Sequence, residues 1–187
     1  MACDPTFTKD WFTDNLEHFR FCAKVVLSHD SALEIGCFEG RATLWLLETF
    51  GHVDAIDTFT GGGEHSGVDM AKVRERFIEN TRHAGESLAL HEGRSDDVLV
   101  NLLGLGRRYD FIYVDGSHAS RDVIIDACLG WRMLAKGGVM LFDDYLWSRG
   151  ATEMDNPRPA IDFFLSTHCD ELDVLYRGWQ VSVRKIK

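Results

Sequence analysis

The sequence predicts a single α/β domain spanning residues 1–187, with a doubly wound, mostly parallel sheet, helices on both faces and a C-terminal antiparallel hairpin. Short apolar runs of strand length alternate with amphipathic segments of helix length, which is typical of βαβ units. Several of these runs end at a glycine turn or at an aspartate, as strands do where open α/β sheets bind ligands. The last two runs, 172–176 and 180–184, are separated by a short glycine-containing turn and therefore predict a hairpin.

Composition excludes several classes of protein. The net charge is -10 and no run of Lys or Arg offsets it, so a nucleic-acid backbone is not expected as the main partner. The cysteines are odd in number and widely spaced, which indicates reduced thiols. They are Cys3, Cys22, Cys37, Cys128 and Cys169. No apolar run approaches the ~20 residues of a membrane span, and the N-terminus does not have the pattern of a signal peptide. We therefore expect a cytoplasmic protein with no membrane partner.

The N-terminal part of the chain predicts a helical cap followed by a ligand-binding turn. Apolar residues at helical spacing over 8–29 predict a helix or helix pair within 1–30, begun by Thr8 or Thr13. A strand over 32–35 then enters a turn with the spacing E-x-G-x-x-x-G, and a helix follows. Glycines in such a turn let the backbone approach a ligand closely. A tight strand–helix connection with no ligand is the alternative explanation.

The next strand, 53–57, ends at Asp57, at the distance from the glycine turn where nucleotide-binding folds place the acid that accepts the ribose hydroxyls. The segment 58–67 contains four glycines and predicts a loop that closes over a substrate. A helix over 68–82 and a strand over 88–91 follow. Ser95 is expected either to cap the next helix, through Leu103, or to contact a base.

The segment 109–145 predicts a strand–helix–strand unit that brings acids together. The strands 109–114 and 137–142 flank a helix over 121–135, which Gly137-Gly138 should end. Right-handed crossover makes these strands parallel, so Asp115, Asp143 and Asp144 should converge at one edge of the sheet. Three carboxylates in one place are difficult to keep ionised without a cation. An irregular rim segment, 145–158, and a helix over 160–167 precede the hairpin.

With these residues the chain resembles the class I S-adenosylmethionine-dependent methyltransferases, which have a Rossmann-like fold. Glu34-Ile35-Gly36, with Gly40, is similar to their first motif, Asp57 to their ribose-binding acid, and Gly93-Arg94-Ser95-Asp96 to the turn that flanks adenine. The resemblance implies S-adenosylmethionine as cofactor. It also implies the cofactor-binding residues Glu34, Gly36, Cys37, Gly40, Asp57, Thr58, Ser95, Asp96 and Asp115.

Within that superfamily, Val114-Asp115-Gly116-Ser117-His118 followed by Asp143-Asp144-Tyr145 is similar to the small divalent-metal-dependent O-methyltransferases of catechol and antibiotic-sugar type. The likeness implies Mg²⁺, or another divalent cation, bound by Asp115, Asp143 and Asp144. It implies methyl transfer to a hydroxyl of a small molecule, with His118 or Asp115 as general base. The chain lacks the long N-terminal extension of such enzymes, so the identity of the acceptor does not carry over.

Other functions stay open at this stage. A nicotinamide oxidoreductase could use a similar sheet, although the glycine spacing and the acids fit it poorly. A non-catalytic module that binds a nucleoside or a partner could keep the fold. A metal-independent methyltransferase could use Asp115 or His65 as base. The acceptor could be a sugar, a catechol or a polyketide-like phenol, and a homodimer is left open.

Overall fold

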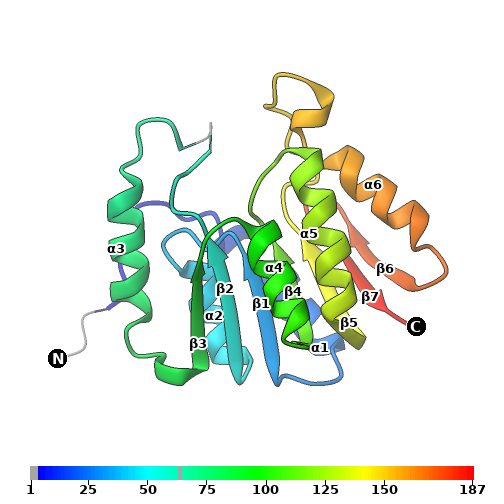
Figure 1. Cartoon of the computed structure of the whole chain (residues 1–187), viewed down its shortest axis with the longest axis horizontal. Helices are drawn as coiled ribbons and strands as arrows, with labels where there is room; N and C mark the ends of the chain where they lie inside the picture. Colours follow the sequence, from blue (N-terminus) through cyan, green and yellow to red (C-terminus); the bar gives the residue numbers. More distant parts are fainter. Residues whose placement is uncertain (1–3, 63–64) are drawn as a thin grey trace.

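The computed structural model describes residues 4–62 and 65–187. Cys3 and the centre of the predicted glycine loop, residues 63 and 64, lie outside the described residues. The fold is a single seven-stranded sheet with the strand order β3-β2-β1-β4-β5-β7-β6 (Figure 1). The strands are β1 (Ser31–Ile35), β2 (His52–Asp57), β3 (Leu88–Glu92), β4 (Tyr109–Val114), β5 (Leu134–Phe142), β6 (Leu172–Arg177) and β7 (Val181–Lys185).

The sheet is parallel from β3 to β5, and β7 runs antiparallel to both of its neighbours. The chain order doubles back at β1, so β1 and β4 are neighbours although two βα units separate them in the sequence. The loops that follow β1 and β4 therefore lie side by side at the switch point, where open α/β sheets bind their ligands. The predicted doubly wound sheet with a C-terminal antiparallel hairpin is confirmed.

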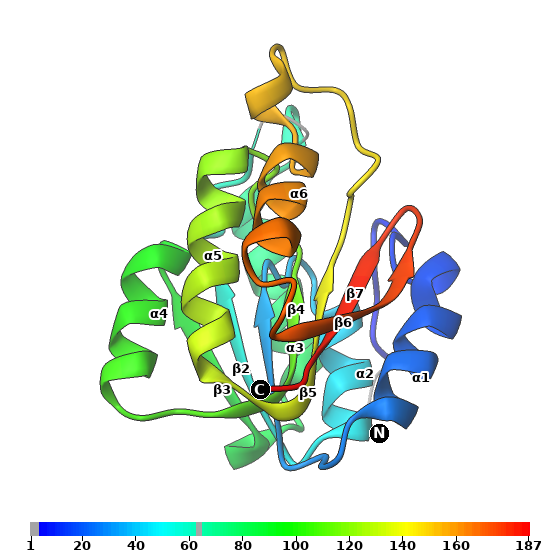
Figure 2. The ribbon, with the colours of Figure 1, turned by 90° about the vertical axis from the view of Figure 1, so that its right-hand side faces the viewer.

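Within residues 4–62 and 65–187, six α-helices cover the two faces of the sheet, three on each. They are α1 (Leu16–Val25), α2 (Arg41–Thr49), α3 (Met70–Thr81), α4 (Ser95–Gly104), α5 (Ser120–Met133) and α6 (Arg158–Thr167). Figure 2 shows α4, α5 and α6 on one side of the sheet and α1 and α2 on the other, and Figure 1 places α3 beside α2. One apolar core packs α4, α5 and α6 against alternate residues of the central strands, and two smaller clusters pack α1, α2 and α3 on the opposite face.

The N-terminal segment differs from the prediction. Helix occurs only over η1 (Thr13–Asn15) and α1, and residues 4–12 form neither helix nor strand. Neither Thr8 nor Thr13 caps a helix: the Thr8 hydroxyl donates to Glu39, and Thr13 lies inside the 3₁₀ turn. The non-helical segment runs against the glycine turn, because its polar groups find partners there rather than within a helix.

The predicted glycine stop between α5 and β5 is wrong. Helix α5 ends at Met133 and β5 begins at the next residue, so Gly137 and Gly138 lie inside the strand. The pairing of β4 with β5 shifts register between Tyr109 and Phe111, and Gly137 has φ +83°. The glycines therefore accommodate an irregular stretch of strand.

Long segments gather at the C-terminal edge of the parallel strands. The segment after β2 and the segment that carries η4 (Glu153–Asp155) both rise above this edge, at the top of Figure 1. None of the described helices is both long and apolar enough to cross a membrane. The 3₁₀ turn η3 (Gly85–Ser87) leads into β3 at the opposite edge.

Candidate active site

An open cleft of about 1290 Å³ runs along the C-terminal edge of the sheet. Its walls are the glycine turn after β1, the turns after β2 and β3, the segment 115–119 after β4, and the rim segment after β5. Helix α5 and the N-terminal segment contribute further side chains. Most of the predicted site residues therefore share one cavity, whereas Glu34, Cys37 and Gly40 are not among the residues that line it.

Gly36 has the tightest backbone surroundings in the cleft. Its φ is +86°, a backbone conformation that residues with a side chain rarely adopt. Its N–H donates to the Ile56 carbonyl at 2.8 Å. A Cβ atom on Gly36 would lie 2.0 Å from the carbonyl oxygen of Asp115. Gly40, at φ +84°, precedes α2 and also lies in the left-handed region. Because Gly36 has no side chain, the turn after β1 can contact the backbone of the turn after β4.

Asp57 binds the glycine turn itself. Its Oδ2 accepts the N–H groups of Cys37 and Phe38 at 3.0 and 2.9 Å, and its Oδ1 accepts the Phe59 N–H at 2.8 Å. Oδ2 thus already accepts two hydrogen bonds, whereas Oδ1 keeps a further lone pair, and Asp57 lines the cleft. The neighbouring Thr58 is exposed and its hydroxyl pairs with Thr60. Asp57 thus organises the turn as well as offering a carboxylate to a ligand.

Glu34 is buried at the end of β1. The Thr43 hydroxyl donates to its Oε2 at 2.5 Å, and within the described part of the chain its Oε1 is among the buried atoms without a hydrogen-bond partner. Burial, together with the nearby negative charge of Asp57, raises the pKa of Glu34 to about 8, against the lowering effect of Thr43. Burial likewise raises the pKa of the Cys37 thiol well above its usual value. Glu34 is therefore a largely protonated acid below the first glycine.

The turn after β3 differs from the predicted cap. Ser95 is the first residue of α4, and no side chain caps this helix. Burial raises the pKa of Asp126 on α5 to about 7, and the nearby Ser95 hydroxyl opposes this rise. Asp96 is held by Arg94, whose Nε and Nη2 donate to the two carboxylate oxygens at 3.1 and 2.9 Å. The turn after β3 therefore presents Asp96 paired with Arg94, and Ser95 beside α5.

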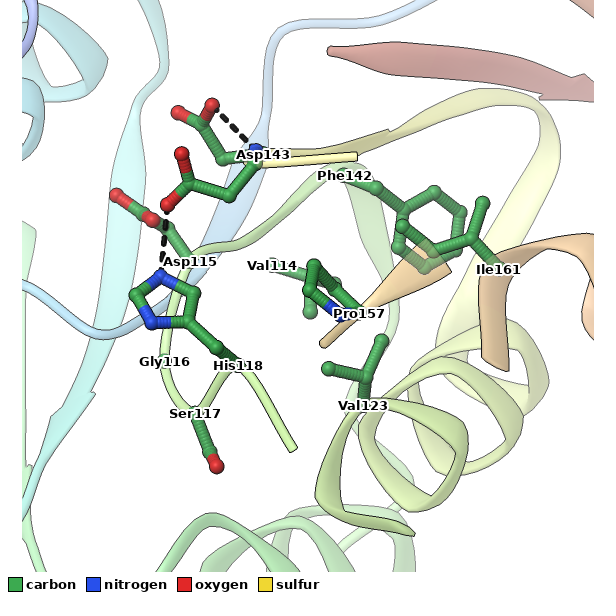
Figure 3. A pocket seen from close by; sticks show the side chains of 11 residues that line it. Val114, Asp115, Gly116, Ser117, His118, Val123, Phe142, Asp143, Pro157 and Ile161 are labelled. Carbon is green, nitrogen blue, oxygen red and sulfur yellow. Dashed lines mark hydrogen bonds and ion pairs between the residues drawn. The ribbon is translucent and has the colours of Figure 1, made fainter. Parts of the chain in front are cut away.

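Asp115, His118 and Asp144 come together at the other end of the cleft. One ligand atom from each lies within 4.8 Å of the others, and His118 Nε2 lies 2.7 Å from Asp144 Oδ2. Figure 3 shows the His118 ring and the Asp115 carboxylate at the left of the view, and the apolar side chains of Phe142 and Ile161 at the right. Asp144 adopts φ +56°, an uncommon backbone conformation for a residue with a side chain. This strained position directs its carboxylate toward the histidine.

Asp143 is placed differently from its neighbour. Its Oδ2 accepts hydrogen bonds from Gln180, at 2.9 Å, and from Asn15, at 3.2 Å, and it also contacts the Tyr113 hydroxyl. The same hydroxyl lies 2.8 Å from Asp115 Oδ2. The predicted set of three aspartates is therefore arranged as Asp115 and Asp144 with His118, while Asp143 is connected to Asp115 through a buried phenol.

The pKa values of Asp115 and Asp143 lie above the ordinary value of an aspartate. Burial, followed by the charges of Asp143 and Asp144, raises the pKa of Asp115 well above its ordinary value. Burial and the charge of Asp144 raise the pKa of Asp143, although hydrogen bonds from Tyr113 and Gln180 oppose this. A phenol has one hydrogen and can donate to only one of the two carboxylates it contacts. Either a proton or a bound cation would reduce the electrostatic repulsion between these carboxylates.

Two tryptophans that the sequence analysis did not identify border the cluster. Trp147 stacks on His118, with ring centroids 4.3 Å apart and 21° between the planes. Trp179, in the β6–β7 turn, donates from Nε1 to Asp144 Oδ1 at 3.1 Å. Both line the cleft, and Trp179 is 49% exposed. They form an aromatic wall beside His118 and Asp144, which no local motif could indicate because each residue comes from a different loop.

The N-terminal segment packs on the glycine turn after β1. Glu39, 1% exposed, accepts the N–H and the hydroxyl of Thr8 at 2.6 and 2.7 Å. Trp11 packs against Phe38 of the glycine turn, with ring centroids 4.9 Å apart. His65 stacks on Phe38 from the loop after β2, with ring centroids 5.4 Å apart. The histidine that the sequence offered as an alternative base thus belongs to an aromatic cluster on the glycine turn.

Comparison with known proteins agrees with this geometry. Residues 33–145 match the methyltransferase domain family. A structure described as a candidate O-methyltransferase from Klebsiella pneumoniae superposes with a TM-score of 0.70 at 14% identity, over 97% of this chain and 84% of that one. An rRNA methylase from Streptococcus thermophilus gives 0.67 at 11% identity, over 97% and 100%. CalS11, a TDP-rhamnose 3'-O-methyltransferase of calicheamicin biosynthesis, gives 0.61 at 20% identity, over 92% and 79%.

No curated protein sequence shows significant similarity to this chain. The three structural matches named above are each below 25% identity, so they establish the fold and leave the substrate open. The matched family segment covers more than half of the chain and runs from the end of β1 to Tyr145. We conclude that the chain belongs to the methyltransferase domain family and has the fold of the class I S-adenosylmethionine-dependent methyltransferases.

Proposed function

We propose that the protein transfers a methyl group from S-adenosylmethionine to a hydroxyl of a small molecule, with His118 as general base and a divalent cation at Asp115 and Asp144. The observation that carries this proposal is the 2.7 Å contact between His118 and Asp144 beside Asp115, in the same cleft as the glycine turn. A base, an acid pair and a cofactor turn in one cavity are what methyl transfer to oxygen requires.

The donor side of the proposal follows the strand order. The turn through Gly36, Cys37 and Gly40 would carry the methionine part, with Glu34 beneath it, and Asp57 with Thr58 would lie beside the ribose. Ser95 and Asp96 would flank the base. Asp115 follows β4, the neighbour of β1, so it stands between this donor side and the acid cluster. The donor and the acceptor would thus meet over the contact between Gly36 and Asp115.

The donor set of the acid cluster fits a hard divalent cation. Carboxylate oxygens are the ligands that Mg²⁺ prefers, with water completing its shell. Burial and like charges already raise the pKa of Asp115, so a positive ion would offset an unfavourable arrangement. Asp115 and Asp144 would hold the ion, and Asp143 would hold Asp115 in place through Tyr113. When bound, the cation would lower the pKa of an acceptor hydroxyl.

His118 is oriented for proton abstraction. If Asp144 is ionised, Nε2 of His118 carries the proton that it donates, and Nδ1 is the basic nitrogen. Stacking on Trp147 restricts rotation of the ring. In the reaction, the acceptor oxygen forms a bond to the methyl carbon, the methyl–sulfur bond breaks, and sulfur keeps the electron pair. The hydroxyl proton passes to His118.

The charges of the cleft favour a small acceptor over RNA. Many aspartates line the cleft, whereas its basic lining residues, among those the structure describes, are Arg94 and Arg149. Arg94 is already paired with Asp96. Binding to a nucleic-acid backbone depends on Lys and Arg at phosphates, and the chain as a whole carries -10. The rRNA methylase therefore shares the fold, and we propose an acceptor closer in size to that of CalS11.

A metal-independent methyltransferase is the second candidate. The observation that favours it is the Asp144–His118 pair, since a carboxylate that orients a histidine can support general base catalysis without an ion. In that case Asp115 would only shape the cleft.

A direct test measures binding of S-adenosylmethionine, S-adenosylhomocysteine and NAD(H) by calorimetry, followed by mass spectrometry of small catechols and sugars incubated with the protein. We expect binding of the sulfur nucleosides and a mass gain of one methyl group that depends on Mg²⁺. Binding of NAD(H) with no binding of S-adenosylmethionine would overturn the proposal. Methyl transfer that is undiminished in EDTA would select the metal-independent candidate.

A further inference from the structure

His18, in the first turn of α1, has a polar contact at each of its ring nitrogens. Its Nδ1 lies 2.8 Å from Gln180 Oε1, and its Nε2 lies 2.9 Å from the Ser182 hydroxyl oxygen. Gln180 is 2% exposed and Ser182 is fully buried. The Tyr176 ring packs against the imidazole, with ring centroids 4.4 Å apart. The ring is therefore held at both nitrogens, although no sequence motif marks this histidine.

Gln180 connects this histidine to the acid cluster. Its Nε2 donates to Asp143 Oδ2 at 2.9 Å. Asp143 also contacts the Tyr113 hydroxyl, which lies 2.8 Å from Asp115 Oδ2. A continuous line of polar contacts thus runs from α1, through the residue before β7, to the carboxylate that we propose as a ligand of the cation.

The chemistry of each group fixes the direction of these hydrogen bonds. The carboxylate of Asp143, when ionised, only accepts, so Gln180 must present its NH2 group to Asp143 and its carbonyl oxygen to His18. A carbonyl oxygen also only accepts, so the nitrogen that faces it, His18 Nδ1, must carry a proton. In the neutral ring Nε2 is then the acceptor, and the Ser182 hydroxyl donates to it. One tautomer of His18 satisfies all of these contacts.

The proton on Nδ1 has a consequence for Gln180. Without it, the amide could keep its orientation only with a buried carbonyl oxygen that receives no hydrogen bond from His18. If the amide rotated instead, its oxygen would face a carboxylate oxygen of Asp143. Both arrangements cost free energy, because a buried polar group needs a partner and two acceptors repel each other. The His18 proton therefore favours the orientation in which Gln180 donates to Asp143.

The residue before Gln180 holds the second acid. Trp179 donates from Nε1 to Asp144 Oδ1 at 3.1 Å, and its carbonyl accepts the Tyr145 N–H at 2.8 Å. Adjacent residues of the β6–β7 turn thus bind Asp143 and Asp144. A contact that fixes this turn from α1 can therefore act on the acid cluster from a distance.

We propose that His18 is a positioning residue: the proton on its Nδ1 holds the Gln180 amide toward Asp143 and so keeps Asp143 and Asp115 in the arrangement that binds a divalent cation. The cation rests on the proposed function, whereas the placement of Gln180 does not. His18 is not among the residues that line the cleft, so it acts through Gln180 and not by contact with a substrate.

The first test measures the tautomer of His18 in the full-length protein by long-range ¹H–¹⁵N NMR at about pH 8. Burial lowers the pKa of His18, against the effect of Gln180, so the ring is neutral there. We expect the proton on Nδ1. Packing alone would accept either tautomer, since the Ser182 hydroxyl can donate or accept. A proton on Nε2 would overturn the proposal, because Gln180 would then have to turn its NH2 group toward His18.

The second test compares two variants of the same shape. The amide nitrogen of Asn stands as many bonds from the backbone as Nδ1 of His, so His18→Asn keeps a donor, whereas the equally branched His18→Leu does not. In calorimetric titrations of Mg²⁺, His18→Leu should raise the Kd by about fivefold, the factor that one net hydrogen bond contributes. Asn15 also donates to Asp143, which limits the loss. His18→Asn should stay close to the wild type.

The outcomes separate this proposal from a packing role. Both variants lose the contacts of the ring with Tyr176 and Ser182, so equal effects on the Kd for Mg²⁺ would overturn the proposal. The affinity for S-adenosylhomocysteine should be the same in the two variants and the wild type. Thermal unfolding checks folding, and if His18→Leu does not fold, the tautomer in the wild type decides.

The outcomes also separate it from the proposed function. If the wild type binds no S-adenosylhomocysteine, the proposed function fails as a whole. If it binds no Mg²⁺, the cation in the proposed function fails. The role of His18 is then decided by its tautomer and by the NMR signals of the Gln180 side-chain amide. These signals should move in His18→Leu and stay in place in His18→Asn, and the same shift in both variants would overturn the proposal.

Discussion

His118 Nε2 and Asp144 Oδ2 lie 2.7 Å apart, although the two residues are 26 positions apart in the chain. They belong to the turns after β4 and β5, which are neighbouring parallel strands. Asp144 reaches the histidine from a left-handed backbone conformation, at φ +56°. Strain of this kind persists only where the surrounding structure maintains it, and here the Trp179 indole holds the other carboxylate oxygen.

Replacing His118 should reduce catalysis and spare cofactor binding. We expect His118→Gln to lower kcat by ~10²–10⁴, because a positioned general base contributes that much. The affinity for S-adenosylhomocysteine should stay within a factor of about two, since the proposed donor site lies on the other side of Asp115. Calorimetry and initial rates check both quantities. His83→Gln, at an exposed histidine, is the control, and a His118 variant as fast as this control would contradict the role of base.

Removing the cation or one of its proposed ligands should affect activity in a defined order. EDTA should abolish turnover and Mg²⁺ should restore it. Asp144→Asn should raise the Mg²⁺ concentration for half-maximal activity by at least about tenfold, as loss of a ligand would. Asp143→Asn should have the smaller effect, because its carboxylate already has protein donors. Equal effects of the two variants would show that Asp143 is a ligand, as the sequence predicted.

Substitution of Gly36 should be far more damaging than substitution of another glycine with positive φ. A Cβ on Gly36 would meet the Asp115 carbonyl oxygen at 2.0 Å, whereas one on Gly67, at φ +83°, would meet no atom within 4 Å. We expect Gly67→Ala to cost ~1 kcal/mol of unfolding free energy and Gly36→Ala to cost on the order of 3 kcal/mol or more. Urea denaturation measures both, and similar losses would contradict the close contact.

Stability should depend on pH through Glu34. Its folded pKa of about 8 lies above its usual 4.5. Between these values the folded state binds more protons than the unfolded state, so the contribution of Glu34 to stability falls as pH rises from 5 to 8, by roughly 3 kcal/mol. Glu34→Gln should therefore be more stable than the wild type at pH 8, with little difference at pH 5. Urea denaturation of both proteins at pH 5 and pH 8 measures this, and an equal difference in unfolding free energy at the two pH values would refute it.

The sequence was sufficient for the sheet because strand and helix patterns alternate clearly and crossover handedness fixes the rest. The boundary between α5 and β5 was missed, since the glycine pair served an irregular strand rather than a helix end. The N-terminal helix was predicted too long, because residues 4–12 find their partners in the glycine turn, which is distant in sequence. Local patterns cannot reveal such contacts.

The site was predictable in part for the same reason. The positions of Asp115, Asp143 and Asp144 directly after predicted strands identified them as site residues. The direction of each side chain, however, depends on residues that are distant in the sequence. Asp143 turns toward Asn15 and Gln180, which come from the two ends of the chain. Asp126 carried no signal, because a single acid on a helix is usually solvated and only the packing of α5 against α4 buries it.

The meeting of Gly36 with the backbone of Asp115 has a consequence for how a methyl group would travel. The two turns touch through their backbones, and no rotatable side chain lies between them. The distance between the proposed donor and acceptor positions should therefore vary as little as the spacing of β1 and β4. In such an arrangement, variation in the rim loops can change which molecule is modified while the length of the transfer step stays the same.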